Sequence, residues 1–261
     1  MVERLGVRRL VAPNPSPMTG DGTNTYLVGE LAVAVVDPGP AMPEHVGAIL
    51  AALAPGARLA AILLTHGHAD HAGAVSELRD RTGAPVFGHG VLAEVDRPLA
   101  DGATLDLAHE RIQALATPGH ADEHFCFWLP ERRALLSGDL IAGRGTVVLS
   151  QTPGALSRYL ASLERLRELG PFALLPGHGQ PLEDGQAKVA EYLAHRAMRE
   201  QQIVAALIVG AATVDELVAR LYAETPAALH PMAARNVRAH LERLAELGRA
   251  REEDGRWRPR P

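Results

Sequence analysis

The sequence has 261 residues, 47% of them hydrophobic and 22% charged, with a formal net charge of −5 at pH 7. This composition is ordinary for a globular protein, and the length allows one large domain or one domain with a small appendage. The single cysteine, Cys126, excludes an intramolecular disulfide framework and is expected to be a buried thiol. The longest apolar run, residues 203–214, is too short for a membrane-spanning helix, and residues 1–17 lack an apolar signal core. We therefore expect a soluble, cytoplasmic protein.

The first 60 residues predict a loop, a hairpin and a helix. Residues 10–25 are rich in proline and glycine, which is typical of a loop. Residues 26–28 and 31–36 predict a β-hairpin that ends at Asp37. Residues 43–53 predict a helix. Asp37 lies just after a strand and is followed by Pro38 and Gly39, which is typical of a turn residue.

The next apolar run, residues 60–64, predicts a fully buried strand because it shows no polar alternation. Four potential metal ligands follow it within six positions: His66, His68, Asp70 and His71. Residues 69–78 then predict a helix, with Asp70 in its first turn, where a carboxylate suits the helix dipole. Imidazole and carboxylate groups bind Zn, Fe, Mn and Co. This strand-to-helix corner therefore predicts a metal site, with room for two adjacent ions.

Further strands lead into further potential ligands. The predicted strands cover residues 85–87, 104–107, 111–116, 124–129, 134–136 and 172–175. Three of them precede His120, Asp139 and His178, and residues 156–169 predict an amphipathic helix. His89 also follows a strand, but we expect it to be structural or exposed. Because each candidate ligand follows a strand end, we expect a layered α/β fold to gather them.

The pattern becomes helical after residue 185. The sequence predicts three helices, over residues 186–209, from the capping box of Thr213 and Glu216 onward, and over residues 231–247. The dipeptide Asp254-Gly255 is typical of a two-residue hairpin turn. Three helices followed by a small hairpin look like a winged helix. We therefore expect two domains, one with the metal site over residues 1–185 and a winged-helix-like one over residues 186–261.

The order of these motifs resembles the metallo-beta-lactamase superfamily. The resemblance is carried by Val35-Val36-Asp37-Pro38-Gly39, His66-x-His68-x-Asp70-His71, Thr117-Pro118-Gly119-His120, Ser137-Gly138-Asp139 and Pro176-Gly177-His178-Gly179. Within the superfamily, the chain resembles the beta-lactamase-like protein 2 family. That resemblance is carried by residues 24–29, 117–122, 137–141 and 143–146 and by the winged-helix-like C-terminus.

The resemblance implies an αββα sandwich, in which two β-sheets lie face to face with helices outside. It also implies two metal ions, one held by His66, His68 and His120, the other by Asp70, His71 and His178, with Asp139 bridging both. The implied ions are zinc, with iron or manganese as alternatives, and the implied nucleophile is a hydroxide that bridges them. Asp70 would then also act catalytically by orienting this hydroxide, and Asp37 would support the ligands from behind.

The bridging aspartate narrows the expected function. Asp139 resembles the glyoxalase II, nuclease and lactonase branches, whereas zinc beta-lactamases generally lack an aspartate there. The beta-lactamase-like protein 2 family includes a zinc-dependent endoribonuclease of single-stranded RNA, so a dinuclear zinc hydrolase acting on RNA is the first expectation. The alternatives are a glyoxalase II-like thioesterase, another ester or lactone hydrolase, and a binding module that retains a metal site. The oligomeric state stays open.

One basic residue is a candidate for binding substrate. Arg144 follows Asp139 in a glycine-flanked loop, where it would either bind a substrate anion or remain a solvated loop residue. The region from residue 195 onward carries 11 arginines and 9 acidic residues. A dedicated RNA-binding surface is usually more basic than that. Charge therefore favours RNA only weakly.

Overall fold

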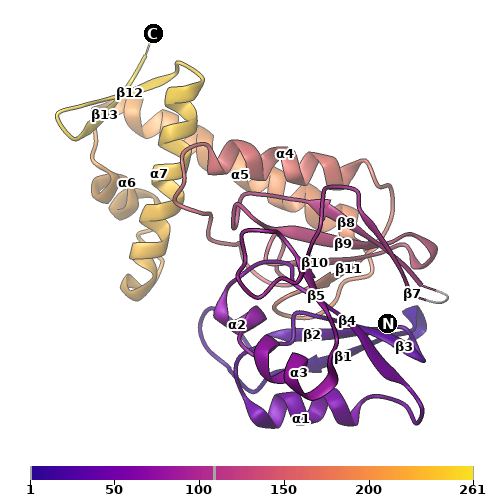
Figure 1. The fold of residues 1–261 in the computed structure, drawn as a ribbon. Helices are drawn as coiled ribbons and strands as arrows, with labels where there is room; N and C mark the ends of the chain where they lie inside the picture. The colour runs from indigo at the N-terminus through magenta and orange to yellow at the C-terminus, as the bar shows by residue number, and fades with distance from the viewer. Residues whose placement is uncertain (1, 108–109, 261) are drawn as a thin grey trace. The chain divides into compact units, whose positions relative to one another are not determined.

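The structure, a computed structural model, describes residues 2–107 and 110–260 and divides into two compact units (Figure 1). The first unit contains both large β-sheets together with helices α1 (Pro43–Ala51), α2 (Ala69–Ala72) and α3 (Val75–Thr82). The second contains α4 (Ala155–Arg167), most of α5 (Gly185–Val209), α6 (Val214–Leu221), α7 (His230–Glu246) and a C-terminal hairpin. The expected domain boundary after residue 185 stays a prediction.

The first sheet contains the buried strand that precedes the candidate ligands. Its six strands run in the order β1 (Val7–Val11), β2 (Asn24–Val28), β3 (Ala32–Val36), β4 (Arg58–Leu63), β5 (Val86–Gly88) and β6 (Arg97–Pro98). Strands β1 to β3 pair antiparallel, and β3 to β6 pair parallel. Strand β4 is thus central, with a parallel neighbour on each side. This position explains why residues 60–64 are almost continuously apolar.

The second sheet faces the first across an apolar core. Its five strands run in the order β11 (Ala173–Pro176), β10 (Ala134–Gly138), β9 (Phe125–Leu129), β8 (Glu110–Ala116) and β7 (Thr104–Leu107). The core between the sheets includes Val36 and Leu63 from the first sheet and Phe127, Leu136 and Leu175 from the second. The cysteine of β9, Cys126, is a buried thiol, as predicted.

Helices α1 and α3 cover the outer face of the first sheet (Figure 1). Ile49 of α1 and Leu78 of α3 belong to one buried cluster with Val35 and Ile62 of the sheet. The alternation along β3 and β4 places one set of side chains in this cluster and the other set between the two sheets. The predicted fold class, an αββα sandwich, is confirmed.

The helix predicted over residues 69–78 is instead two helices, α2 and α3, separated at Gly73 and Ala74. The loop after β3 causes this break. Gly39 donates its N–H to the carbonyl of His71 (3.0 Å) and accepts the N–H of Ala74 (3.0 Å), so neither group continues the helix. A Cβ atom on Gly73 would lie 2.8 Å from the backbone nitrogen of Ala41, so the close approach requires glycine.

The C-terminal elements follow the predicted order of three helices and a hairpin. Thr213 and Glu216 form the predicted capping box, with N–H to side-chain distances of 3.0 and 3.2 Å. The hairpin consists of β12 (Ala250–Glu253) and β13 (Arg256–Pro259), joined through Asp254 and Gly255, which both have positive φ. The helices and hairpin share a core that includes Ile203, Leu217, Val237, Leu241 and Trp257. No helix among the described residues is long and apolar enough to cross a membrane.

Candidate metal centre

The parallel pairing of β3 with β4 aligns their carboxyl ends, since Val36 is the register partner of Leu63. Asp37 therefore lies beside Thr65, although the two are 28 positions apart in sequence. The buried carboxylate of Asp37 accepts hydrogen bonds from the Thr65 N–H (2.8 Å) and the Thr65 hydroxyl (2.7 Å). Its φ of 51° is unusual for a residue other than glycine, and these two bonds fix it in that conformation.

Hydrogen bonds behind His66 and His71 determine which ring nitrogen each presents. The Thr65 hydroxyl gives its hydrogen to Asp37, so at 3.0 Å from His66 Nδ1 it accepts the ring N–H. Asp37 Oδ2 lies 2.8 Å from His71 Nδ1 and accepts that N–H in the same way. In both residues Nε2 is therefore the nitrogen that presents a lone pair once the ring is neutral.

Backbone carbonyls anchor two further histidines through the same nitrogen. His120 Nδ1 lies 2.8 Å from the carbonyl oxygen of Val148, and His178 Nδ1 lies 3.4 Å from that of Gly22. Metal-binding histidines in proteins almost always donate their other N–H to such an acceptor. These histidines thus fit metal ions in the orientation of their rings as well as in their residue type.

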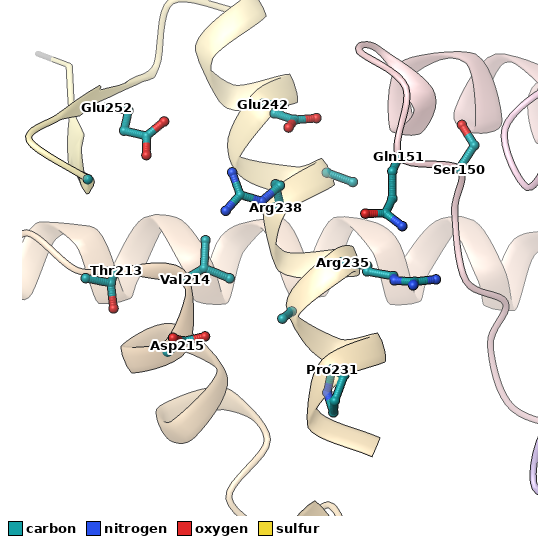
Figure 2. Close-up of a pocket in the computed structure, with 13 residues that line it drawn as sticks. Ser150, Gln151, Thr213, Val214, Asp215, Pro231, Arg235, Arg238, Glu242 and Glu252 are labelled. Atoms are coloured by element: carbon teal, nitrogen blue, oxygen red, sulfur yellow. The ribbon is translucent and has the colours of Figure 1, made fainter. Parts of the chain in front are cut away.

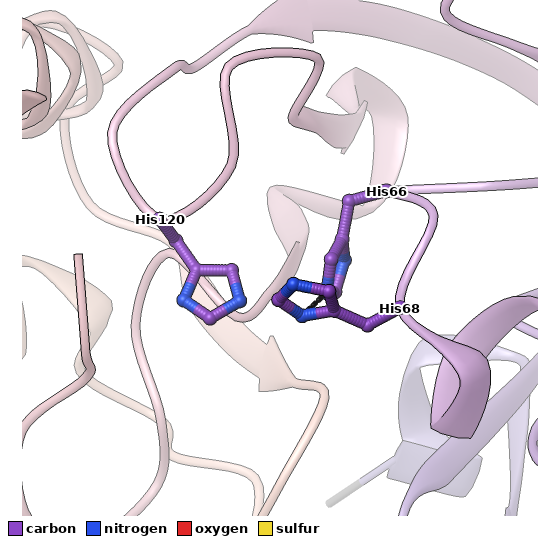
Figure 3. Close-up of side chains that lie close together, drawn as sticks. All are labelled: His66, His68 and His120. Atoms are coloured by element: carbon purple, nitrogen blue, oxygen red, sulfur yellow. Dashed lines mark hydrogen bonds between the residues drawn. The ribbon is translucent and has the colours of Figure 1, made fainter. Parts of the chain in front are cut away.

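The seven predicted ligands form three overlapping groups. Within each group, the candidate ligand atoms lie within 4.8 Å of one another. The groups are His66, His68 and His120, shown in Figure 3; His66, His71 and Asp139; and Asp70, His71 and His178. His66 and Asp139 therefore share a group, and His71 connects that group to Asp70 and His178. The chemistry of the donors, five imidazoles and two carboxylates, suits borderline transition metals such as zinc and iron.

Short distances connect the members of these groups. His66 Nε2 lies 2.9 Å from His68 Nδ1, and His71 Nε2 lies 3.3 Å from His178 Nε2. The Nε2 of His178 is 3.2 Å from Asp70 Oδ2 and 3.3 Å from Asp139 Oδ2. His71 Nε2 is 3.4 Å from the other oxygen of Asp139. Nitrogen and oxygen atoms thus converge on a small volume from several directions.

The electrostatics of the cluster favour positive charge within it. Burial lowers the pKa of His71, but the carboxylates of Asp139 and Asp37 outweigh burial and leave that pKa well above the usual value. Burial also opposes the carboxylates at His178, whose pKa is still raised to about 9. The pKa of Asp139 is held well below its ordinary value, because the adjacent His71 and His178 outweigh burial. In the metal-free protein His71 and His178 therefore carry protons, which a bound metal ion would replace.

His124 is a positioning residue of the site that the sequence motifs did not reveal. Its buried ring accepts the N–H of Asp139 at Nε2 (3.3 Å), so Nδ1 carries the hydrogen that is donated to the Thr117 hydroxyl (3.0 Å). A Cβ atom on Gly138, whose φ is +46°, would lie 2.8 Å from His124 Nε2. The backbone around Asp139 is therefore held by this histidine. Its position at the start of an otherwise apolar strand was the available signal.

Asn24 is a second residue that the sequence did not assign to the site. Its buried amide donates two hydrogen bonds, to the carbonyls of Pro176 (2.8 Å) and Gly179 (2.8 Å), which flank His178. The N–H of Asn24 donates to Gly177 (2.7 Å). Strand β2 thereby fixes the loop that presents His178. Asparagine is depleted in strands, so its presence at the start of a buried strand was a usable signal.

Two histidines outside the sequence motifs, and the candidate Arg144, lie outside the ligand groups. Among the described residues, neither His89 nor His195 belongs to any of the three groups. The N–H of Val91 donates to His89 Nδ1 (3.3 Å), which is a local turn contact. Arg144 is exposed, and its loop is attached to the site because Gly143 donates its N–H to the carbonyl of His178 (2.8 Å).

Comparison with known proteins agrees with this geometry. Residues 18–178 match the family model described as Metallo-beta-lactamase superfamily. The chain belongs to this superfamily. Metallo-beta-lactamase superfamily proteins are generally hydrolases that bind divalent metals, and this member carries a matching His/Asp cluster. Residues 213–257 match a second model, the Beta-lactamase associated winged helix domain, which confirms the predicted winged helix.

Two of the proteins similar to this metallo-beta-lactamase superfamily member match nearly its whole length, and a third matches about two thirds of it. It is 34% identical over 263 residues to the beta-lactamase-like protein 2 homolog of Caenorhabditis elegans, which covers 95% of this chain and 87% of the relative. A metallo-beta-lactamase family protein from Thermus thermophilus has a similar crystal structure, with a TM-score of 0.81, 27% identity and coverage of 98% and 99%. Another similar structure, solved in a di-iron-bound form, has a TM-score of 0.56 and 31% identity, with coverage of 69% and 96%.

Proposed function

We propose that this chain is a dinuclear metal-dependent hydrolase. His66, His68 and His120 would hold one ion, and Asp70, His71 and His178 would hold the other. Asp139 would bridge them, since it shares a group with His66 and lies within 3.3–3.4 Å of His178 and His71. The observation that carries the proposal is the common orientation of four histidines, whose Nδ1–H groups face fixed acceptors.

Bound metal ions would supply Lewis acidity and lower the pKa of a coordinated water towards about 7. The chain itself supplies orientation and proton handling. Asp37 and Thr65 keep two rings in the required tautomer, and His124 fixes the backbone of Asp139. Asp70 is the carboxylate suited to accept a proton from the attacking water. Its side chain is 31% exposed and its pKa is lowered, because His178 and His71 outweigh burial, so it is ionised at neutral pH.

A phosphodiester of single-stranded RNA is the first proposed substrate, with zinc as the first proposed metal. Its support is the whole-chain likeness to beta-lactamase-like protein 2 homologs and the exposed Arg144 on a loop bonded to His178. A guanidinium there suits the non-bridging oxygens of a phosphate. The similar structure solved with two irons supports iron as the alternative metal.

The test is cleavage of a labelled single-stranded RNA by protein loaded with zinc, manganese or iron. Asp139→Ala should remove activity, and His89→Ala, a histidine outside the ligand groups, should retain it. Equal cleavage by wild type and Asp139→Ala would identify a contaminating nuclease and sink the RNA proposal. Thioesters of glutathione and coenzyme A, a lactone and a beta-lactam are assayed in parallel. Hydrolysis of one of these compounds without RNA cleavage would support the hydrolase proposal and replace RNA as the proposed substrate. A protein inactive on all of them would point instead to a binding module.

A further inference from the structure

A recess lies entirely within the second unit, which we call the C-terminal unit, against helix α7 (Figure 2). Its volume is about 340 Å³, which is at the lower end of the range for small-molecule sites. Ser150 and Gln151 line it together with α7, the start of α6 and the C-terminal hairpin. None of its lining residues is a candidate metal ligand, so the recess is chemically separate from the metal centre.

One part of the recess is basic. Arg235 and Arg238 are one helical turn apart on α7, so their side chains lie on the same face. Both are exposed, and neither guanidinium makes a hydrogen bond within the part of the chain that the structure describes. Gln151, labelled in Figure 2, also lines the recess and adds an amide donor. Two guanidinium groups and an amide on one recess suit a phosphate group, because guanidinium forks match its oxygens.

The other part of the recess is acidic. Glu242 lies one further turn along α7, Glu252 belongs to β12 of the hairpin, and Asp215 lies in the first turn of α6. Burial raises the pKa of Glu242; Arg238 opposes this, and Glu246 and Glu252 add to it. Carboxylates under such mutual repulsion are stabilised by hydrogen-bond donors. A uniformly anionic ligand does not match this arrangement, whereas a ligand with a phosphate at one end and N–H or O–H donors at the other does.

The arrangement around α7 also limits what can approach it. In helix-turn-helix proteins, the helix equivalent to α7 enters the major groove of duplex DNA. Here the Ser157 hydroxyl of α4 donates to Glu246 of α7 (2.8 Å), and the segment with Ser150 and Gln151 borders the same helix. The chain therefore covers part of α7. What stays open is a recess the size of one nucleotide.

We propose that this recess binds a nucleotide-sized phosphate ester, with its phosphate on Arg235 and Arg238 and its sugar or base donors on Glu242 and Glu252. The chemistry is the same for a free mononucleotide and for the phosphorylated end of an RNA strand. The site does not depend on the metal centre or on the proposed hydrolysis.

Isothermal titration calorimetry of the full chain with adenosine 5′-monophosphate tests the proposal. The double variant Arg235→Gln/Arg238→Gln should bind at least roughly tenfold more weakly, since two charge-assisted hydrogen-bonding groups are lost. Arg220→Gln, an exposed arginine of the same unit outside the recess, is the matched control and should bind like the wild type. Adenosine, which lacks the phosphate, should bind the wild type much more weakly than the monophosphate does.

Two further arms separate the alternatives. Asp139→Ala should bind the nucleotide as the wild type does, which distinguishes this recess from the metal centre. Preference for a 5′-phosphorylated RNA decamer over its 5′-hydroxyl form would support the proposal with an RNA end as the ligand. Binding of the monophosphate without that preference would support it with a free nucleotide. Absence of binding to the wild type, or equal binding by the double variant with an unchanged melting temperature, would overturn the proposal.

Discussion

Hydrogen bonds behind the imidazole rings decide which nitrogen four of the candidate histidines present to the centre. Asp37 is the clearest case, because one carboxylate holds both the Thr65 hydroxyl and the His71 ring. The sequence alone left Asp37 as either a turn residue or a supporting group. The structure shows both features in Asp37: its φ is positive, and its carboxylate contacts Thr65 and the candidate ligand His71.

Asp37→Asn separates these two features, because asparagine tolerates the same φ but loses the charge. We expect a folded protein whose affinity for the ion at His71 falls by roughly 10- to 100-fold. Asp254→Asn is the matched control, since Asp254 has the same φ of 51° in the hairpin turn. Competition titration with a chromophoric chelator measures the affinities. Unchanged affinity in Asp37→Asn would show that the carboxylate acts on the turn alone.

The raised pKa values of His178 and His71 predict that metal binding releases protons at pH 7. With a pKa of about 9, the His178 ring is protonated in the metal-free protein and must lose that proton to bind an ion. Affinity should therefore rise between pH 6 and about 9. The stability of the metal-free protein should change in the opposite direction and fall as pH rises. The proton on His178 contributes its full stabilisation below pH 6.5, and this contribution is lost as pH rises through about 9. Calorimetry in two buffers of different ionisation enthalpy measures the release, and zero release would contradict the electrostatic account.

At the scale of elements, helix α7 contains a buried histidine with a strong pH consequence. His240 is fully buried, and neither of its ring nitrogens has a hydrogen-bond partner among the described residues. Burial and the nearby Arg196, Arg199, Arg243 and His195 of α5 and α7 together lower its pKa to about 3, and burial is the largest cause. Because the pKa of His240 in the folded protein is below 6.5, its contribution to stability is fully present above pH 6.5. This contribution is lost as pH falls towards 3.

The lowered pKa of His240 predicts that acid unfolding depends on this one side chain. Stability should fall by about 1.4 kcal/mol per pH unit below pH 6 through His240 alone. His240→Leu should flatten that slope, whereas His230→Gln, at the partly exposed start of the same helix, should leave it unchanged. Urea unfolding between pH 4 and 7 measures the slope. A wild-type slope retained in His240→Leu would mean that other groups cause the acid sensitivity.

Sequence patterns predicted the elements whose signal is local and missed those that depend on tertiary contacts. The apolar run of β4 and the capping box of α6 are local and were predicted correctly. The break between α2 and α3 was missed because it depends on Gly39, which contacts His71 and Ala74 only in the fold. Strand β1 was missed because Arg8 and Arg9 interrupt its apolar pattern.

The candidate site divides in the same way. The seven ligands were predicted because their motif order is visible in the sequence. Their supports, Thr65, His124 and Asn24, were missed, because each acts through a hydrogen bond to a partner that is 15 to 155 positions away. The roles of all these residues at a metal stay predictions.

At the scale of the whole molecule, the two units are not consecutive along the chain. Helix α4 belongs to the C-terminal unit, although it precedes β11 of the first unit. A protein cut after residue 185 would keep α4 but lose α7, including the bond from Ser157 to Glu246. We therefore expect residues 1–185 to melt at a lower temperature than the full chain does. If differential scanning fluorimetry gave the same melting temperature for residues 1–185 and for the full chain, α4 would be stable without the rest of the C-terminal unit.

Metal stoichiometry tests the central claim most directly. Elemental analysis of protein reconstituted with zinc and freed of excess metal should give two equivalents per chain. The Asp139→Ala protein should retain clearly fewer than two, because its carboxylate is shared by both proposed sites, and the His195→Ala protein should retain both ions. A wild-type protein that saturates at one equivalent or none, or an Asp139→Ala protein that retains two, would contradict the dinuclear centre.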